Sequence, residues 1–178
     1  MDFYTPERGV PIYLKYGEMP ARRAWVAQVV GWVPVYLKGV GNGCVVYGAD
    51  GLEMVVGRDA RWVRRQIAAF HCISYDEMRK EFARLYDKTQ CAPLIVAARG
   101  LVFFAVKART KLRGRNDGAT GYLANTAVDE VESLGPQASR ISLIGGRTLD
   151  VPMSKAAVLQ RMAEAEAFWV RLHRQHVW

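Results

Sequence analysis

The sequence is poor in the residues that staple small domains or bind metals. Its 178 residues include only three cysteines and three histidines. The cysteines are odd in number and widely spaced, which fits neither a disulfide framework nor a zinc site. We therefore expect no metal and no cofactor, and a reducing, cytoplasmic location.

Long apolar runs are also missing. The most apolar stretch, 24–40, is interrupted by Gln28, Pro34 and Lys38, so it falls short of the ~20 continuous apolar residues that a membrane-spanning helix needs. The first residues lack the basic-then-apolar order of a secretory signal. The sequence thus predicts no membrane partner.

Recognisable catalytic motifs are absent as well. The glycine cluster 39–43 has no following Lys-Ser or Lys-Thr pair, which favours a tight turn over a phosphate loop. His71 and Cys72 are adjacent rather than spaced as metal ligands, and no Ser/His/Asp or H-E-x-x-H pattern occurs. We predict that the protein is not an enzyme, with an unrecognised hydrolase as an alternative.

Positive charge is concentrated in one part of the chain. The net formal charge is +8; residues 58–115 carry 14 basic and 5 acidic side chains, whereas residues 1–57 and 116–178 are close to neutral. A surface made only for solubility mixes both signs throughout. A concentrated basic segment favours a polyphosphate partner, because each neutralised phosphate releases condensed counterions.

Hydrophobic patterning predicts an α+β fold in a single domain, 1–178. It has a β-rich N-terminal part (1–57), a basic middle (58–115), and a hairpin with a long amphipathic C-terminal helix (116–178). Alternating residues predict strands in 25–37, 94–96 and 101–106, and short antiparallel hairpins over 44–56 and 141–151. The segment 122–134 fits a strand or a helix equally well.

A central helical pair is predicted by its start signals. The first helix begins after Asp59 and buries Val63 and Ile67. The second begins at a Ser74–Glu77 capping box. Ser154 is a suitable N-cap for the C-terminal helix.

Five cations alternate with other residues after the 101–106 strand. In an extended chain, side chains two apart share a face, so these five would form a basic ribbon roughly 26 Å long. We predict that the ribbon binds the phosphates and the minor groove of DNA. Its members are Lys107, Arg109, Lys111, Arg113 and Arg115.

The helical pair offers a second way to bind DNA. Arg61 and Arg65 share a face of the first helix, and we expect both to contact phosphates. The segment 67–82 also resembles a helix-turn-helix signature, in which Arg79 and Lys80 on the helix at 75–87 would read bases. Asp76 and Glu77 at the start of that helix, and Cys72 at the usual turn glycine, equally suit an ordinary helical hairpin.

The end of the C-terminal helix is rich in large apolar side chains. We predict that Phe168, Trp169 and Leu172 form an oligomer interface, with Val177 and Trp178 beyond them. A symmetric homo-oligomer would place two basic ribbons on two half-sites of double-stranded DNA.

Several ordered features from Ser74 onward resemble the ComK family of competence transcription factors. They are Ser74-Tyr75 with Arg79-Lys80 after it, Pro93-Leu94-Ile95-Val96, Phe103-Phe104, Gly121-Tyr122, Gly145-Gly146, and Val151-Pro152-Met153-Ser154 before a long helix. The resemblance covers residues 74–178; the family's Phe-Pro-Thr strand end is absent after Phe104, and Tyr122 stands where it has tryptophan. It implies a homo-oligomeric activator of competence or DNA-uptake genes that binds A/T-rich duplexes largely through the minor groove.

Charge and resemblance together predict a DNA-binding transcription activator without a cofactor. Two alternatives stay open. One is a helix-turn-helix regulator that reads DNA with the helix at 75–87. The other is a basic protein-interaction module that does not bind DNA.

Overall fold

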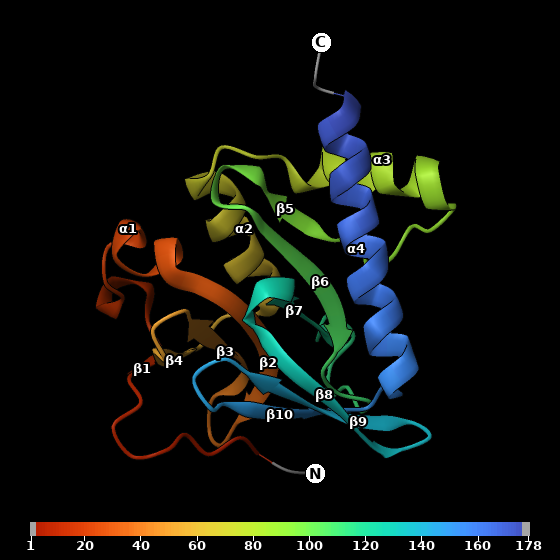
Figure 1. Ribbon diagram of the computed structural model, residues 1–178. Coiled ribbons are helices and arrows are strands. Elements are labelled where there is room, and N and C mark those ends of the chain that lie inside the picture. The colour runs from red at the N-terminus through yellow and green to blue at the C-terminus, as the bar shows by residue number, and fades with distance from the viewer. Residues whose placement is uncertain (1–2, 176–178) are drawn as a thin grey trace.

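Two sheets and a set of helices make up residues 3–175, which a computed structural model describes (Figure 1). The larger sheet has the strand order β1-β4-β3-β2-β7-β6-β5, and the smaller one β10-β9-β8. The strands are β1 (Ile12–Tyr13), β2 (Val29–Leu37), β3 (Gly41–Gly48), β4 (Glu53–Val56), β5 (Leu94–Val96), β6 (Leu101–Lys107), β7 (Thr120–Ala124), β8 (Val128–Gly135), β9 (Ala138–Leu143) and β10 (Thr148–Val151).

The α-helices are α1 (Arg22–Trp25), α2 (Ala60–Phe70), α3 (Tyr75–Tyr86) and α4 (Lys155–Gln175). Short 3-10 turns are η1 (Tyr16–Glu18), η2 (Val26–Gln28), η3 (Ala97–Arg99) and η4 (Asn125–Ala127). This architecture confirms the predicted α+β class, with antiparallel hairpins, a helical pair and a long C-terminal helix. No helix within residues 3–175 has the length and apolar character needed to cross a bilayer.

Helices cover both faces of the larger sheet at its centre. Phe103 of β6 packs against Trp32, whose indole Nε1 donates to the carbonyl oxygen of Ala60 in α2 at 3.0 Å. The next residue, Phe104, points to the opposite face, where α4 runs along β6 (Figure 1). Because neither face meets water, β2 and β6 are apolar almost without alternation.

Strands β2 and β7 join the two halves of this sheet. Trp32 lies opposite Tyr122, and their rings stack with centroids 5.0 Å apart. A Cβ on Gly121 would lie 2.7 Å from the carbonyl oxygen of Trp32 and 2.9 Å from the Cα of Val33. Only glycine therefore allows the strands to approach this closely at position 121.

The three predicted N-caps are confirmed, although only the Ser74 half of the Ser74–Glu77 capping box forms, since the Glu77 carboxylate pairs with Lys80. The side chains of Asp59, Ser74 and Ser154 accept hydrogen bonds from backbone amides three residues later, at 2.7, 3.3 and 3.1 Å. Between α2 and α3, Cys72 has a φ of 54°, a left-handed conformation that ordinarily favours glycine.

Strand boundaries differ from the sequence prediction in three places. β2 begins at Val29, because 22–28 forms α1 and η2. The ambiguous segment 122–134 is strand, interrupted by η4. The predicted hairpin over 141–151 is present as β9 and β10, but β9 already begins at Ala138, and a three-residue loop is closed by the hydrogen bond from Leu143 N to the carbonyl of Arg147 at 2.7 Å.

A buried carboxylate ties the smaller sheet to the larger one. Glu53 of β4 is 6% exposed and lies 2.6 Å from Arg147, in the β9–β10 loop. It also accepts a hydrogen bond from the Tyr4 hydroxyl. Burial, with Glu53 beside it, raises the pKa of Tyr4, so the hydroxyl keeps the proton that it donates.

The structure corrects the predicted oligomer interface at Phe168. That side chain is fully buried within the chain, where its ring meets Phe82 at 5.3 Å and Tyr86 at 6.3 Å. Trp169 and Leu172 are half-buried and line a small apolar pocket beside η3. Self-association through these two stays a prediction, and Val177 and Trp178 lie outside the described residues.

We predict that Gly121→Ala lowers the free energy of unfolding by about 1–3 kcal/mol, because the new methyl group meets backbone that cannot move aside. Urea denaturation measures the change. Gly118→Ala is the matched control, since a Cβ there meets nothing within 4 Å. Equal losses in the two variants would contradict the proposed strand contact.

Candidate nucleic-acid interface

The predicted basic ribbon is a folded loop, and the extended geometry was wrong. Only Lys107 belongs to a strand, and residues 108–119 form an irregular segment between β6 and β7. We call residues 107–119 the basic loop. Its five cations do not share one face, because part of the loop folds back onto β2.

Tyr36 of β2 organises this loop. Its hydroxyl donates to Asp117 Oδ2 at 2.7 Å and accepts from the backbone amide of Arg113 at 2.8 Å. Asp117 Oδ2 also accepts from the amide of Gly114 at 3.0 Å. The hydrogen bond from Tyr36 is the main reason that the pKa of Asp117 lies below its usual value.

Arg109 anchors the loop from inside. Its guanidinium stacks on Tyr36, with Cζ 4.1 Å from the ring centroid. It donates to Asn42 Oδ1 at 2.7 Å and to the carbonyl of Gly118 at 2.6 and 2.9 Å. Burial lowers the pKa of Arg109. This residue therefore holds the loop in place, rather than projecting outward as the ribbon prediction required.

The remaining loop cations are exposed. Lys107, Lys111 and Arg115 have no carboxylate within 4 Å in the described part of the chain. Arg113 is also exposed and lies over the rings of Phe3 and Tyr36 at 4.4 and 4.9 Å. Three of the five predicted residues thus present charge that no neighbouring acid compensates.

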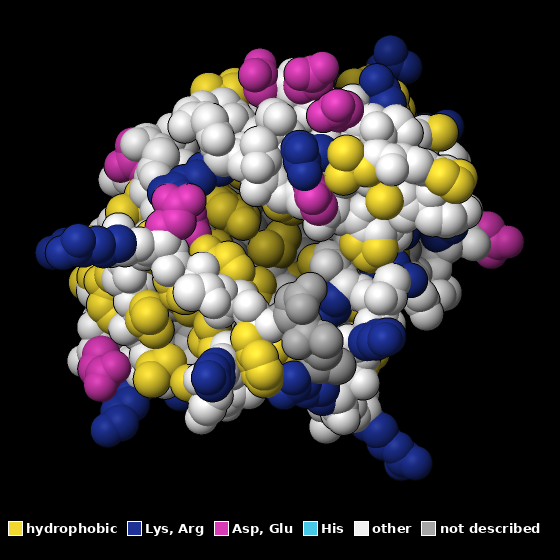
Figure 2. Space-filling model, turned by 90° about the horizontal axis from the view of Figure 1, so that it is seen from below, with side chains coloured by type: hydrophobic (Ala, Val, Ile, Leu, Met, Phe, Trp, Pro, Cys, Tyr) yellow, Lys and Arg dark blue, Asp and Glu magenta, His cyan; other side chains and the backbone are white. Residues whose placement is uncertain are grey.

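Helix α2 joins the loop to form one basic surface. Arg61 Nη2 donates to the carbonyl oxygen of Asn116 at 2.8 Å, and Arg65 is exposed one helical turn further on. We define the basic surface as Arg61, Arg65, Lys107, Lys111, Arg113 and Arg115. In Figure 2, several Lys and Arg side chains gather at the lower centre and right of the face seen from below, and Asp and Glu are more frequent along its upper and left edges.

A polar cleft of about 580 Å³ adjoins this surface between α2 and α3. Arg61, Arg64 and Arg79 line it. Arg64 lies over the ring of Tyr75, 3.8 Å from its centroid, and donates to the Tyr122 hydroxyl at 3.2 Å. The Tyr75 and Tyr122 hydroxyls are 3.0 Å apart. Burial is the main reason that the pKa of Tyr75 is raised.

Helix α3 differs from the basic surface in that its cations are paired. Arg79, Lys80 and Arg84 each lie beside a carboxylate three residues earlier, at 3.8, 2.7 and 2.5 Å. The outward charge of α3 is therefore largely balanced. α2 and α3 are joined by a tight turn at the left-handed Cys72, which is the arrangement that a helix-turn-helix requires. The structure brings Arg79 into the cleft with Arg61, but Lys80 does not line it.

Sequence reasoning missed two residues of this region. Arg64 had no visible signal, since its role depends on tyrosines of α3 and β7. Leu112 did have one: it is a single apolar residue among alternating cations, and it is 49% exposed in the loop. Some minor-groove proteins insert apolar side chains between base pairs.

Residues 3–175 contain no group of three His, Cys, Asp or Glu side chains able to hold a metal ion. A scan of family models and searches of curated proteins and of solved structures find no match to this chain. The charges and contacts of the site therefore carry the functional argument.

We predict that Tyr36→Phe loosens the basic loop while leaving the fold intact, because it removes the hydroxyl and keeps the buried ring. The pKa of Asp117 should rise toward its ordinary value, and the Arg113 amide should exchange faster with solvent. In the parent protein the lowered pKa means that these bonds are complete above the ordinary aspartate pKa and are lost as the pH falls through the lowered one.

An NMR titration of the Asp117 carboxyl measures the shift. The control is Tyr16→Phe, which changes an exposed tyrosine that lies outside the basic loop and β2. The loop does not depend on Tyr36 if both variants leave the titration of Asp117 unchanged.

Proposed function

We propose that this protein binds double-stranded DNA through the basic surface formed by α2 and the basic loop. One observation carries the proposal. The cations Arg61, Arg65, Lys107, Lys111 and Arg115 have no acidic partner within 4 Å in residues 3–175, whereas those of α3 are paired. Uncompensated charge on the exposed side chains of one loop and of the helix beside it suits a phosphate backbone, because each phosphate contact releases condensed counterions.

The shape of the loop supports binding in the minor groove. Arg115 lies in a tight turn closed by the hydrogen bond from Asp117 N to the carbonyl oxygen of Gly114, and Arg113 and the exposed Leu112 come directly before it. Arginine is drawn into narrow A/T-rich minor grooves by their strong negative potential. Tyr36, Asp117 and Arg109 hold this segment in one conformation, so less entropy is lost when DNA binds.

The likeness to the ComK family extends this proposal to a biological role. We propose that the protein is a transcription activator of competence or DNA-uptake genes that works as a homo-oligomer in the cytoplasm. Its support is the resemblance over 74–178, which includes the β6–β7 region and the final helix.

A helix-turn-helix reader is the second candidate, and one observation favours it. The turn between α2 and α3 has its left-handed residue, Cys72, at the place where such motifs usually carry glycine. In that case Arg79 in the cleft and Lys80 would face the major groove. The ion pairs of α3 make this the weaker candidate.

We predict that changing Lys107, Lys111 and Arg115 together to Gln weakens DNA binding without affecting stability, because all three are exposed. The plot of log affinity against log salt should flatten by about 2.7, at about 0.9 for each lost phosphate contact. Fluorescence anisotropy with a labelled duplex at several salt concentrations measures this slope.

The control for this experiment removes the same charge from cations that already have acidic partners. It combines Lys80→Gln, Arg84→Gln and Arg140→Gln. Its slope should stay close to that of the parent protein. If the control flattens the slope as much as the loop variant does, the basic surface has no special part in binding, and either net charge or the α3 cations of the helix-turn-helix candidate govern it.

The groove can be identified by exchanging base pairs. An I·C pair presents the minor groove of A·T, because inosine lacks the 2-amino group of guanine, but the major groove of G·C. We predict that an A/T-rich duplex keeps its affinity when A·T pairs become I·C and loses it when they become G·C. Loss of affinity in the I·C duplex would favour the helix-turn-helix candidate.

A further inference from the structure

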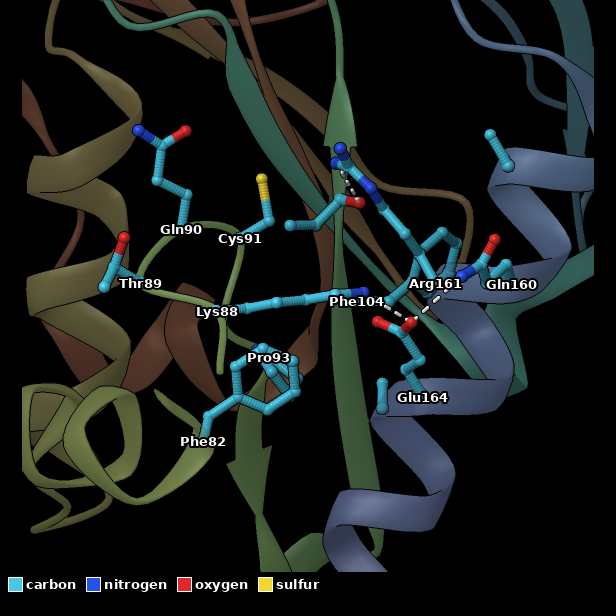
Figure 3. Close-up of a pocket in the computed structure, with 13 residues that line it drawn as sticks. Phe82, Lys88, Thr89, Gln90, Cys91, Pro93, Phe104, Gln160, Arg161 and Glu164 are labelled. Atoms are coloured by element: carbon cyan, nitrogen blue, oxygen red, sulfur yellow. Dashed lines mark hydrogen bonds and ion pairs between the residues drawn. The ribbon is translucent and has the colours of Figure 1, made fainter. Parts of the chain in front are cut away.

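A pocket separate from the basic surface lies between α4 and the segment 88–93 that follows α3 (Figure 3). Its volume is about 480 Å³, within the range of small-molecule sites. The buried side chains of Phe82, Pro93 and Phe104 form its apolar floor. Two aromatic rings and a proline suit a flat hydrocarbon body.

One wall of this pocket carries a cation fixed in position. Arg161 of α4 is half-buried, and its Nη1 donates to the carbonyl oxygen of Ala105 at 3.0 Å. No carboxylate of residues 3–175 lies within 4 Å of it. Its charge is therefore uncompensated beside an apolar floor, where an anion would gain most from meeting it.

A second cation spans the pocket. Figure 3 shows Lys88 reaching from the segment after α3 to Glu164 on α4, and Lys88 Nζ donates to Glu164 Oε1 at 2.6 Å. The same oxygen accepts from Gln160 at 3.1 Å. The side chains of Lys88 and Glu164 are 46% and 23% exposed, so water reaches the ion pair mainly through the lysine. A ligand carboxylate can therefore reach Lys88, in competition with Glu164.

We propose that this pocket binds a small amphipathic carboxylate, in addition to the DNA that the basic surface would bind. The apolar body of the ligand lies on Phe82, Pro93 and Phe104. The ligand carboxylate accepts hydrogen bonds from Arg161 and from Lys88. Lys88 then no longer donates to Glu164, which keeps its hydrogen bond from Gln160. Residues 89–91 line both this pocket and the arginine cleft beside α2, so the ligand is separated from the DNA-binding side by one short segment.

The test uses 2-naphthoate as the probe and naphthalene-2-carboxamide as its neutral equivalent, followed by NMR titration of the full chain without DNA. We expect saturable binding of one naphthoate per chain, about tenfold tighter than the amide, because the carboxylate makes charge-assisted hydrogen bonds. Because no DNA is present, a failure to bind naphthoate does not bear on the proposed DNA binding. A failure to bind DNA likewise does not bear on this pocket.

Variants separate the cation from the apolar floor. Arg161→Gln should weaken naphthoate by about tenfold and leave the amide unchanged, whereas Ala157→Phe, which fills the pocket, should weaken both. Glu164→Gln should tighten naphthoate, because it removes the competing carboxylate. Arg171→Gln, an exposed cation elsewhere on α4, is the control and should change nothing.

Three results would overturn the proposal. They are the absence of saturable naphthoate binding at millimolar concentrations, equal affinity for the amide, and equal weakening by Arg161→Gln and Arg171→Gln. Circular dichroism of each variant establishes that it is folded, and Glu164→Gln tests the pocket by a gain of affinity that misfolding could not produce.

Discussion

The stacked pair of Trp32 and Tyr122 is the contact on which the larger sheet depends. It lies where β2 meets β7, and this short pairing joins the strands β1-β4-β3-β2 to the strands β7-β6-β5. Gly31 and Gly121 permit the close approach of the two backbones. Trp32 also donates to Ala60, so the same contact sets the first turn of α2 against the sheet. Within residues 3–175, β2 and β7 are the only neighbouring strands that connect the two halves of this sheet.

The candidate site inherits its geometry from these same two strands. Tyr36 lies four residues after Trp32 on β2, and it contacts Arg109, Arg113 and Asp117 of the basic loop. Tyr122 meets Arg64 and Tyr75 with its hydroxyl, at the wall of the arginine cleft. Buried aromatic rings thus position surface arginines by their polar ends, and the rigid sheet fixes where the positive charge is presented.

Local signals predicted the elements well, and long-range contacts decided the rest. The caps at Asp59, Ser74 and Ser154 and the Gly145-Gly146 hairpin are properties of neighbouring residues, so the sequence revealed them. The path of the basic loop depends on a hydrogen bond between Tyr36 and Asp117, 81 residues apart, and the alternation of cations could not disclose it. Phe168 is similar, because its partners in the core, Phe82 and Tyr86, belong to another helix. Periodicity identifies an apolar side chain but not its partner.

The position of β7 between β2 and β6 has a consequence for how the chain acquires its structure during synthesis. The meander β2-β3-β4 is complete by Val56, yet the outer edge of β2 finds its partner only when Thr120–Ala124 has left the ribosome. Until then Trp32 has no ring to stack on, and a strand almost wholly apolar presents unpaired backbone groups. α2, which emerges in the interval, packs on both β2 and β3 and so covers one face of the nascent meander. Its early formation, helped by the Asp59 cap, would protect the growing chain from pairing with its neighbours.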